Sequence, residues 1–225
     1  MAAKAKVDTA KMSITSVEAK PVQRRPYAPF TTSTLQQDAS RKLGFSATRT
    51  MQTAQKLYEG INVDGETVGL ITYMRTDGVQ IAPEAIPSVR AQIGQDFGEK
   101  YVPSAPRVYN SKAKNAQEAH EAIRPTEIDR TPAKMAPYLD DEQKKLYDLI
   151  WKRTISSQME SAEIERTSVD ITATRNGEKA ILRATGSVIR FDGFLAAYDS
   201  DNDEDADAKR LPALSEGEAI DPGNI

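Results

Sequence analysis

Hydrophobic and polar residues follow helical spacing through the middle of the chain. Residues 33–43 begin at Ser33 or a neighbouring Thr that can cap a helix, with Gln36 at capping-box spacing from Ser33, and stop before Gly44. Residues 46–60 begin at Ser46 and end at Gly60, so two short helices are predicted. The pair is typical of a helix-turn-helix unit, which can bind DNA but is equally a common packing unit. The second helix carries an apolar stripe that indicates a core-facing side, formed by Met51, Ala54, Leu57 and Tyr58.

Three more helices are expected farther along. Pro83 suits the first turn of a helix reaching Phe97, which Pro87 should bend or weaken. After a long loop over residues 99–115, residues 116–123 predict a short helix. Helical spacing would place Gln117, His120, Glu121 and Arg124 on one face. The strongest helical pattern starts at the capping box of Asp140 and Gln143 and runs to about residue 159.

Strand patterns lie toward both ends of the chain. Residues 12–21 predict a strand with one irregular step, which a β-bulge would explain. Alternating residues 169–173 and 180–184 flank Asn176-Gly177, which predicts a β-hairpin with a two-residue turn. Segments 188–191 and 195–198 are also strand-like, and a short strand is expected near Leu211.

This order predicts an α+β fold in which a helical block is inserted into a β-rich domain, because only then can the two β segments pair. We assign residues 1–11 to a disordered leader, residues 12–30 and 160–225 to the β-rich domain, and residues 31–159 to the helical domain. The acidic run 201–207 is expected in a surface loop.

A candidate chemical site lies in the predicted strand 70–77. Side chains in a strand repeat every second residue, so Tyr73, Arg75 and Asp77 should point to one side. A guanidinium beside a phenol can stabilise a developing phenolate and an attacked phosphate, which suggests phosphoryl transfer to tyrosine. By itself the pattern is more typical of a half-buried packing tyrosine at a strand end.

Composition excludes some classes of site and leaves others open. The chain has no Cys and one His, which gives it no disulfides and no zinc-site pattern. No apolar run approaches the roughly 18 residues of a membrane helix, and we expect a soluble, cytoplasmic protein. The net charge of −3 is polarised: residues 1–60 carry +6 and residues 201–225 carry −6.

Three segments together resemble bacterial type IA DNA topoisomerases. They are PFTTSTLQQ at residues 29–37, LITYMRTD at 70–77 and AQEAHEAIRPT at 116–126, in the family's order and near its spacing. The resemblance runs from about residue 14 to about residue 214. It implies the central part of a toroidal enzyme, with the helical, tyrosine-bearing domain inserted into a β-rich hinge domain that forms part of an arch.

The resemblance also implies roles for individual residues. Tyr73 would attack a phosphodiester of single-stranded DNA and join to the 5′ phosphate, while Arg75 would hold the scissile phosphate. His120 would contact a neighbouring phosphate or support the site, although a lone His is most often an ordinary core or surface group. The candidates for the DNA path are Gln117, Arg124, Lys112 and Lys114. The family usually has Ser where this chain has Gly78, which leaves the role of that hydroxyl open.

The family's general acid and magnesium-binding carboxylates lie in an acidic domain whose pattern this sequence lacks. We therefore expect no metal site in the chain itself, no ATP requirement, and no relaxation of negatively supercoiled DNA by the chain alone. Single-stranded DNA is the expected partner, and the chain is expected to be a monomer.

Two other functions fit parts of the sequence. A non-catalytic module that binds single-stranded DNA would use basic loops and aromatic stacking platforms at Tyr27, Phe30 and Tyr109. A tyrosine recombinase is disfavoured, because that chemistry surrounds its tyrosine with several arginines. Trapping DNA covalently on Tyr73 separates the enzyme from the binding module.

Overall fold

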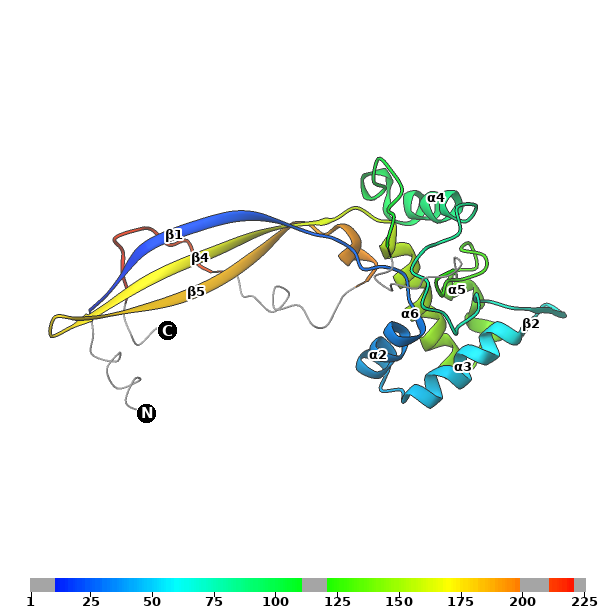
Figure 1. The fold of residues 1–225 in the computed structure, drawn as a ribbon. Coiled ribbons are helices and arrows are strands. Elements are labelled where there is room, and N and C mark those ends of the chain that lie inside the picture. Colours follow the sequence, from blue (N-terminus) through cyan, green and yellow to red (C-terminus); the bar gives the residue numbers. More distant parts are fainter. Residues whose placement is uncertain (1–10, 111–120, 199–210, 221–225) are drawn as a thin grey trace. The chain divides into compact units, whose positions relative to one another are not determined.

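The computed structural model describes residues 11–110, 121–198 and 211–220, and its contacts divide the chain into two compact units (Figure 1). Among the described residues, the β unit holds 11–24, 162–192 and 211–220, and the helical unit holds 25–110, 121–161 and 193–198. Helices and strands thus segregate along the chain, and the fold is α+β as expected. Residues 1–10 of the expected leader and the acidic run 201–207 lie outside the described residues.

The β unit is an antiparallel sheet of four strands in the order β5-β4-β1-β6. β1 (Lys11–Arg24) pairs with β4 (Ala162–Arg175), so the two β segments do meet across the intervening helical block. Figure 1 shows β1, β4 and β5 (Glu178–Phe191) side by side as three long strands. The register shifts between Ile14 and Ser16, which confirms the expected irregular step.

The β4–β5 hairpin turns at Asn176 and Gly177, as the sequence predicts. Both residues have positive φ, 50° and 83°, as the favoured two-residue turn requires. A small core forms where the 211–220 segment covers the sheet. Its members are Met12, Ile14, Val169, Ile171 and Ala173, with Leu211, Leu214 and Ile220 against them.

Two expected strands are absent from the described residues 193–198 and 211–220. Residues 195–198 begin within a 3-10 turn, η3 (Gly193–Ala196), and the last strand is β6 (Ala219–Ile220), not a strand near Leu211. Residues 195–198 do not form a strand because the chain turns to bury Phe194 and Tyr198. Tyr198 belongs to the core of the helical unit, as does Phe30, so both leave the β-rich part to which the sequence analysis assigned them.

The helical unit begins with the two short helices expected from the sequence. α2 (Thr32–Leu43) is capped by Thr31 in a box with Thr34, not by Ser33 with Gln36, and ends at Gly44 in the left-handed region. α3 (Ala47–Glu59) is capped by Ser46 and ends at Gly60. A small hairpin follows, made of β2 (Ile61–Val63) and β3 (Glu66–Val68).

α4 (Ile86–Phe97) starts later than expected. Pro87 lies in its first turn, where a missing N–H costs nothing, so it does not bend the helix. The short turns η1 (Glu99–Tyr101), α5 (Pro132–Met135) and η2 (Ala136–Tyr138) lead to α6 (Asp141–Ser157), which has the expected Asp140–Gln143 capping box. No helix of the described part of the chain is long and apolar enough to cross a membrane.

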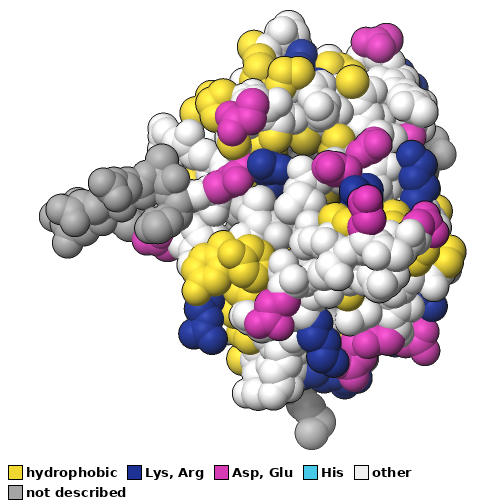
Figure 2. All heavy atoms as spheres, turned by 90° about the vertical axis from the view of Figure 1, so that its right-hand side faces the viewer, with side chains coloured by type: hydrophobic (Ala, Val, Ile, Leu, Met, Phe, Trp, Pro, Cys, Tyr) yellow, Lys and Arg dark blue, Asp and Glu magenta, His cyan; other side chains and the backbone are white. Residues whose placement is uncertain are grey.

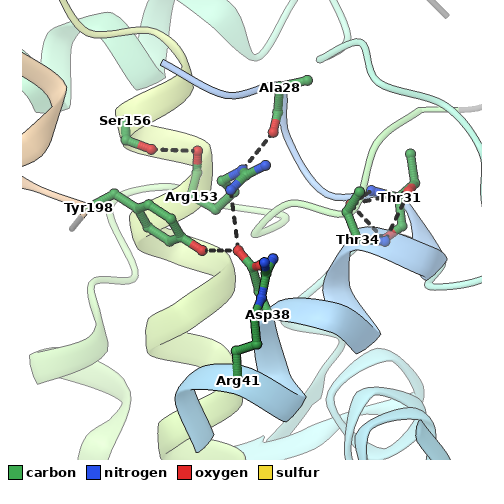
Figure 3. A network of polar contacts seen from close by, with 8 residues as sticks. All are labelled: Ala28, Thr31, Thr34, Asp38, Arg41, Arg153, Ser156 and Tyr198. Atoms are coloured by element: carbon green, nitrogen blue, oxygen red, sulfur yellow. Dashed lines mark hydrogen bonds and ion pairs between the residues drawn. The ribbon is translucent and has the colours of Figure 1, made fainter. Parts of the chain in front are cut away.

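α6 is the central helix of this unit and contacts α2, α3, α4, α5 and η3. Its contacts include a buried charge pair, drawn in Figure 3. Arg153 on α6 donates from Nη1 to Oδ2 of Asp38 on α2 at 3.3 Å, and from Nε to the Ala28 carbonyl at 2.6 Å. Arg41 and the hydroxyl of Tyr198 donate to the same carboxylate. Asp38 is therefore fully engaged although it is buried.

Aromatic rings enclose the Arg153 guanidinium. Its central carbon lies 4.9, 4.7 and 5.2 Å from the ring centroids of Tyr27, Phe30 and Tyr198. Cation–π attraction is strongest when the cation is desolvated, as here. Burial, followed by the hydrogen bond to Asp38, raises the pKa of the Tyr198 hydroxyl, so it remains a donor. One cation thus joins α2, α6 and both ends of the helical unit.

Replacing Asp38 with Ala should destabilise the helical unit by about 3 kcal/mol, because it strands a buried guanidinium. Urea unfolding followed by fluorescence of the single tryptophan, Trp151 on α6, measures this. Asp148→Ala is the control: it removes a surface pair with Lys152, and such pairs contribute about 0.2–1 kcal/mol. Equal losses in both variants would contradict the role given to Asp38.

Candidate functional site

The three sequence segments that carry the family resemblance meet in the helical unit. The Phe30 carbonyl accepts a hydrogen bond from Ile123 N at 2.8 Å, which joins the first segment to the third. Thr72 N donates to the Arg124 carbonyl at 2.9 Å, which joins the second to the third. Thr32 N at the start of α2 donates to the Thr76 carbonyl at 2.9 Å and closes the set. Residues far apart in sequence therefore form one site around 70–77.

The tyrosine segment is irregular, not the strand expected from the sequence. It has an isolated bridge, Ile71 to Pro125, and bends at Met74 and Arg75. Threonine hydroxyls replace part of a strand ladder: Thr72 donates to the Ala122 carbonyl at 2.8 Å and Thr76 to the Glu121 carbonyl at 2.9 Å. Short side chains that bond to nearby backbone favour such irregular conformations.

The expected alternation of side chains nevertheless holds. Tyr73, Arg75 and Asp77 are exposed, while Met74 is buried in the helical core. The backbone on either side is held by Thr32, whose hydroxyl donates to the Met74 carbonyl at 2.7 Å and accepts from Thr76 N at 2.8 Å. Tyr73 and Arg75 thus project from a segment anchored on both sides.

The short helix expected over 116–123 is wrong where the structure describes it. Glu121, Ile123 and Pro125 form isolated bridges to Gln80, Phe30 and Ile71, because the backbone is extended there. The expected helical face that joined Gln117 and His120 to Glu121 and Arg124 therefore has no basis at its described end. His120, Gln117, Lys112 and Lys114 lie outside the described residues.

Arg124 is an internal clamp. Its Nε donates to Glu121, and its Nη1 donates to the carbonyls of Pro125 and Thr126 at 2.8 and 3.2 Å. Glu121 in turn accepts from Ala82 N at 3.0 Å. The Arg124 side chain is only 12% exposed. These contacts fix the segment that supports Thr72 and turn the guanidinium toward the protein's own carbonyls.

Arg75 lines an open pocket of about 460 Å³ beside the N-terminus of α2. The remaining lining comes from Thr31, Thr32, Ser33, Thr76 and Asp77. A helix N-terminus carries partial positive charge, which favours an anion next to a guanidinium. Figure 2 shows one face of the helical unit, on which Lys and Arg side chains lie among Asp and Glu. This face therefore carries no broad patch of positive charge.

Tyr58 is a neighbour of Tyr73 that the sequence analysis assigned to the core. Ala54 and Leu57 of the same stripe are buried, but Tyr58 is 41% exposed and Tyr73 49% exposed. The two rings meet edge to face, with centroids 5.3 Å apart. The polar tip of a tyrosine at the end of an apolar stripe was the available signal that it need not be buried.

The expected stacking platforms are occupied by the protein itself. Phe30 is wholly buried in the core, which corrects its assignment as a platform. Arg153 covers one ring face of Tyr27. Tyr109 donates its hydroxyl to the Ser157 carbonyl at 2.7 Å, and burial raises its pKa to about 12. Tyr27 nevertheless remains 45% exposed, comparable with Tyr58 at 41% and Tyr73 at 49%.

Metal ligands do not gather in the described part of the chain. It contains no group of three or more His, Cys, Asp or Glu that could hold a metal ion. Asp77 is the carboxylate of the Arg75 pocket, and a magnesium ion prefers several oxygen ligands in octahedral geometry. The described residues therefore do not fit the magnesium ion that the resemblance implies.

Comparisons with known proteins agree with the geometry. A family model described as DNA topoisomerase matches residues 1–225. The chain is 49% identical over 217 residues to DNA topoisomerase 1 of Rickettsia bellii, covering 96% of this chain and 27% of the relative. It is 50% identical over 216 residues to the protein of the same name from Xylella fastidiosa, covering 93% of this chain and 26% of that one.

The fold is also found in a solved structure. Full-length topoisomerase I from Thermotoga maritima matches with a TM-score of 0.81 and 34% sequence identity, over 97% of this chain and 34% of that one. The chain thus spans about a quarter of the length of the first curated relatives and a third of the solved structure.

Thr72→Val should loosen the tyrosine segment, because it removes a hydroxyl that donates to the Ala122 carbonyl and accepts from Arg124 N. Losing both bonds should cost about 1–3 kcal/mol in urea unfolding. Thr67→Val, at an exposed position in β3, is the matched control and should change stability little. An unchanged free energy of unfolding in Thr72→Val would show that these bonds do not hold the segment.

Proposed function

Because the chain belongs to the DNA topoisomerase family, we propose that Tyr73 is the nucleophile with which the enzyme cleaves and rejoins single-stranded DNA. The observation that carries this proposal is the meeting of three segments around one exposed tyrosine beside Arg75. Irregular, well-anchored backbone with projecting polar side chains suits a reactive site, because loops positioned by a rigid scaffold often carry function.

The proposed step is a transesterification. The Tyr73 oxygen bonds to a backbone phosphorus, the bond from phosphorus to the 3′ oxygen breaks, and the tyrosine loses its proton while the departing oxygen gains one. The products are a 5′-phosphotyrosine and a free 3′ hydroxyl, and the reverse step reseals the strand. Because the covalent ester keeps the energy of the broken bond, relaxing negative supercoils needs no ATP.

Arg75 has the proposed task of holding the scissile phosphate. A guanidinium stays charged and matches two phosphate oxygens, and it stabilises the extra charge that develops as the tyrosine attacks. The N-terminus of α2 lies on the same pocket and adds positive potential. Asp77, on the opposite flank of Arg75 from Tyr73, has the proposed role of ordering the guanidinium.

Other parts of the reaction are assigned outside these residues. We attribute the general acid and the magnesium ligands to the acidic domain that the family resemblance implies, and derive no step through the metal. Contacts of His120, Gln117, Lys112 and Lys114 with DNA stay predictions, as do a cytoplasmic location and a monomeric state. For Arg124 the observed clamp supports an indirect role, through the segment that holds Thr72.

A non-catalytic module that binds single-stranded DNA is less well supported. It would stack bases on Phe30, Tyr27 and Tyr109, but Phe30 is buried, Tyr27 is covered on one face and Tyr109 is hydrogen-bonded to the backbone. Of the three expected platforms only Tyr27 is exposed in the described part of the chain, at 45%, close to the 49% of Tyr73.

Tyr73→Phe should abolish any covalent DNA adduct while leaving DNA affinity nearly unchanged, because only the hydroxyl is lost. Arg75→Ala should reduce adduct formation about 10²-fold or more, the usual effect of removing one preorganised stabilising group. The measurement is a denaturing gel with end-labelled single-stranded oligonucleotide, using the complete gene product. An adduct that persists in Tyr73→Phe would place the nucleophile elsewhere.

Binding should prefer single-stranded DNA to duplex and should weaken steeply between 50 and 200 mM salt, because phosphate contacts release counterions. Fluorescence anisotropy with a labelled oligonucleotide and its duplex gives both affinities. Arg75→Ala should reduce the slope of log affinity against log salt by about one contact. Affinity that does not change over this salt range would contradict the proposed phosphate contacts.

A further inference from the structure

Tyr58 and Tyr73 form an exposed aromatic pair next to the proposed reaction centre. Their ring centroids are 5.3 Å apart and the ring planes cross at 61°, an edge-to-face geometry that stabilises aromatic pairs. Tyr58 lies at the C-terminal end of α3, whose other stripe residues Ala54 and Leu57 are buried. Tyr58 therefore extends the packed face of α3 out to the Tyr73 ring.

The backbone fixes the two residues relative to each other. Leu70 N donates to the Leu57 carbonyl at 2.8 Å, so the start of the tyrosine segment is hydrogen-bonded to the last turn of α3. Gly69 passes so close that an added Cβ would lie 2.7 Å from the Tyr58 carbonyl oxygen. Only glycine fits this approach without a shift of backbone. The backbone of residues 57–58 and 69–70 is thus in direct contact.

The contact between the two tyrosines is made by the rings. In the described part of the chain, neither Tyr58 nor Tyr73 has a hydrogen bond through its hydroxyl. An exposed tyrosine without such a partner is otherwise free to change rotamer. A nucleophile, however, must lie within about 3–3.5 Å of the atom it attacks, with little angular freedom.

We infer that Tyr58 is a positioning residue: its ring restricts the Tyr73 side chain to the rotamer from which the phenol oxygen reaches the phosphate. This inference rests on the proposed function of Tyr73. Tyr58 transfers no proton and touches no reacting atom; it acts through the edge-to-face contact and lowers the rotational freedom that Tyr73 must lose on attack. The Tyr58 hydroxyl is not needed for this role.

The first test reads the side chain without any reaction. In NMR spectra of the protein, Tyr58→Ala should shift the Tyr73 ring protons and average their rotamer-dependent couplings, because the neighbouring ring is gone. Tyr58→Phe should keep the Tyr73 signals nearly in place. Tyr138→Ala is the matched control, since Tyr138 also packs partly on the helical core but lies in η2. Unchanged Tyr73 signals in Tyr58→Ala would overturn the inference.

The second test separates rate from affinity in the complete gene product. With saturating single-stranded oligonucleotide, Tyr58→Ala should form the covalent adduct about three- to tenfold more slowly, as expected for loss of one aromatic pair. Its affinity for DNA should stay within about twofold of the unaltered protein, and Tyr58→Phe should restore the rate.

The other outcomes are distinct. Weaker DNA binding with an unchanged rate at saturation would mean that Tyr58 stacks on a base, and would overturn the positioning role. Equal loss of rate in Tyr58→Phe and Tyr58→Ala would overturn it as well, since it would implicate the hydroxyl. If Tyr73 is not the nucleophile, adducts will persist in Tyr73→Phe. That result does not depend on the NMR experiment, so it distinguishes failure of the proposed function from failure of the positioning role.

Discussion

The helical unit depends on one buried cation. Arg153 holds Asp38 of α2 against α6 and is itself enclosed by three aromatic rings, so a buried ion pair fixes how α2 packs on α6. The direction of α2 then places Thr32, whose hydroxyl donates to the Met74 carbonyl and whose N–H donates to the Thr76 carbonyl. The proposed active site is thus oriented by a polar contact in the core.

A regular strand would not present the reactive side chains in the same way. Strands require a continuous ladder of backbone bonds, whereas threonine hydroxyls make several of the bonds around Tyr73. The Thr32 hydroxyl donates to the Met74 carbonyl and accepts from Thr76 N, and the hydroxyls of Thr72 and Thr76 donate to the carbonyls of Ala122 and Glu121. This leaves the backbone bent at Met74 and Arg75, with Met74 as an apolar anchor and its two neighbours exposed. The same bonds that prevent a strand give the segment a single conformation.

The two units are stabilised in different ways. The β unit is a ribbon of long antiparallel strands whose small core is completed by the returning segment 211–220. The helical unit closes on itself through the pairing of Phe30 with Ile123 and the burial of Tyr198. Each unit therefore has its own core although neither is continuous in sequence.

Local rules determined much of this protein from sequence alone: the caps of α3 and α6 and the Asn176-Gly177 turn follow from interactions within a few residues. The exposure of Tyr73, Arg75 and Asp77 was predicted from a strand, but contacts with Thr32, Ala122 and Glu121 hold their segment. Only the tertiary structure decided where the rest lies. Phe30 became core and Tyr58 met Tyr73, because these outcomes depend on aromatic partners 168 and 15 positions away. The Arg124 clamp binds near neighbours in sequence, but its partner Glu121 also accepts from Ala82 N, 39 positions away. Periodicity describes a single element; it carries no information about which distant carbonyl, ring or hydroxyl will satisfy a side chain.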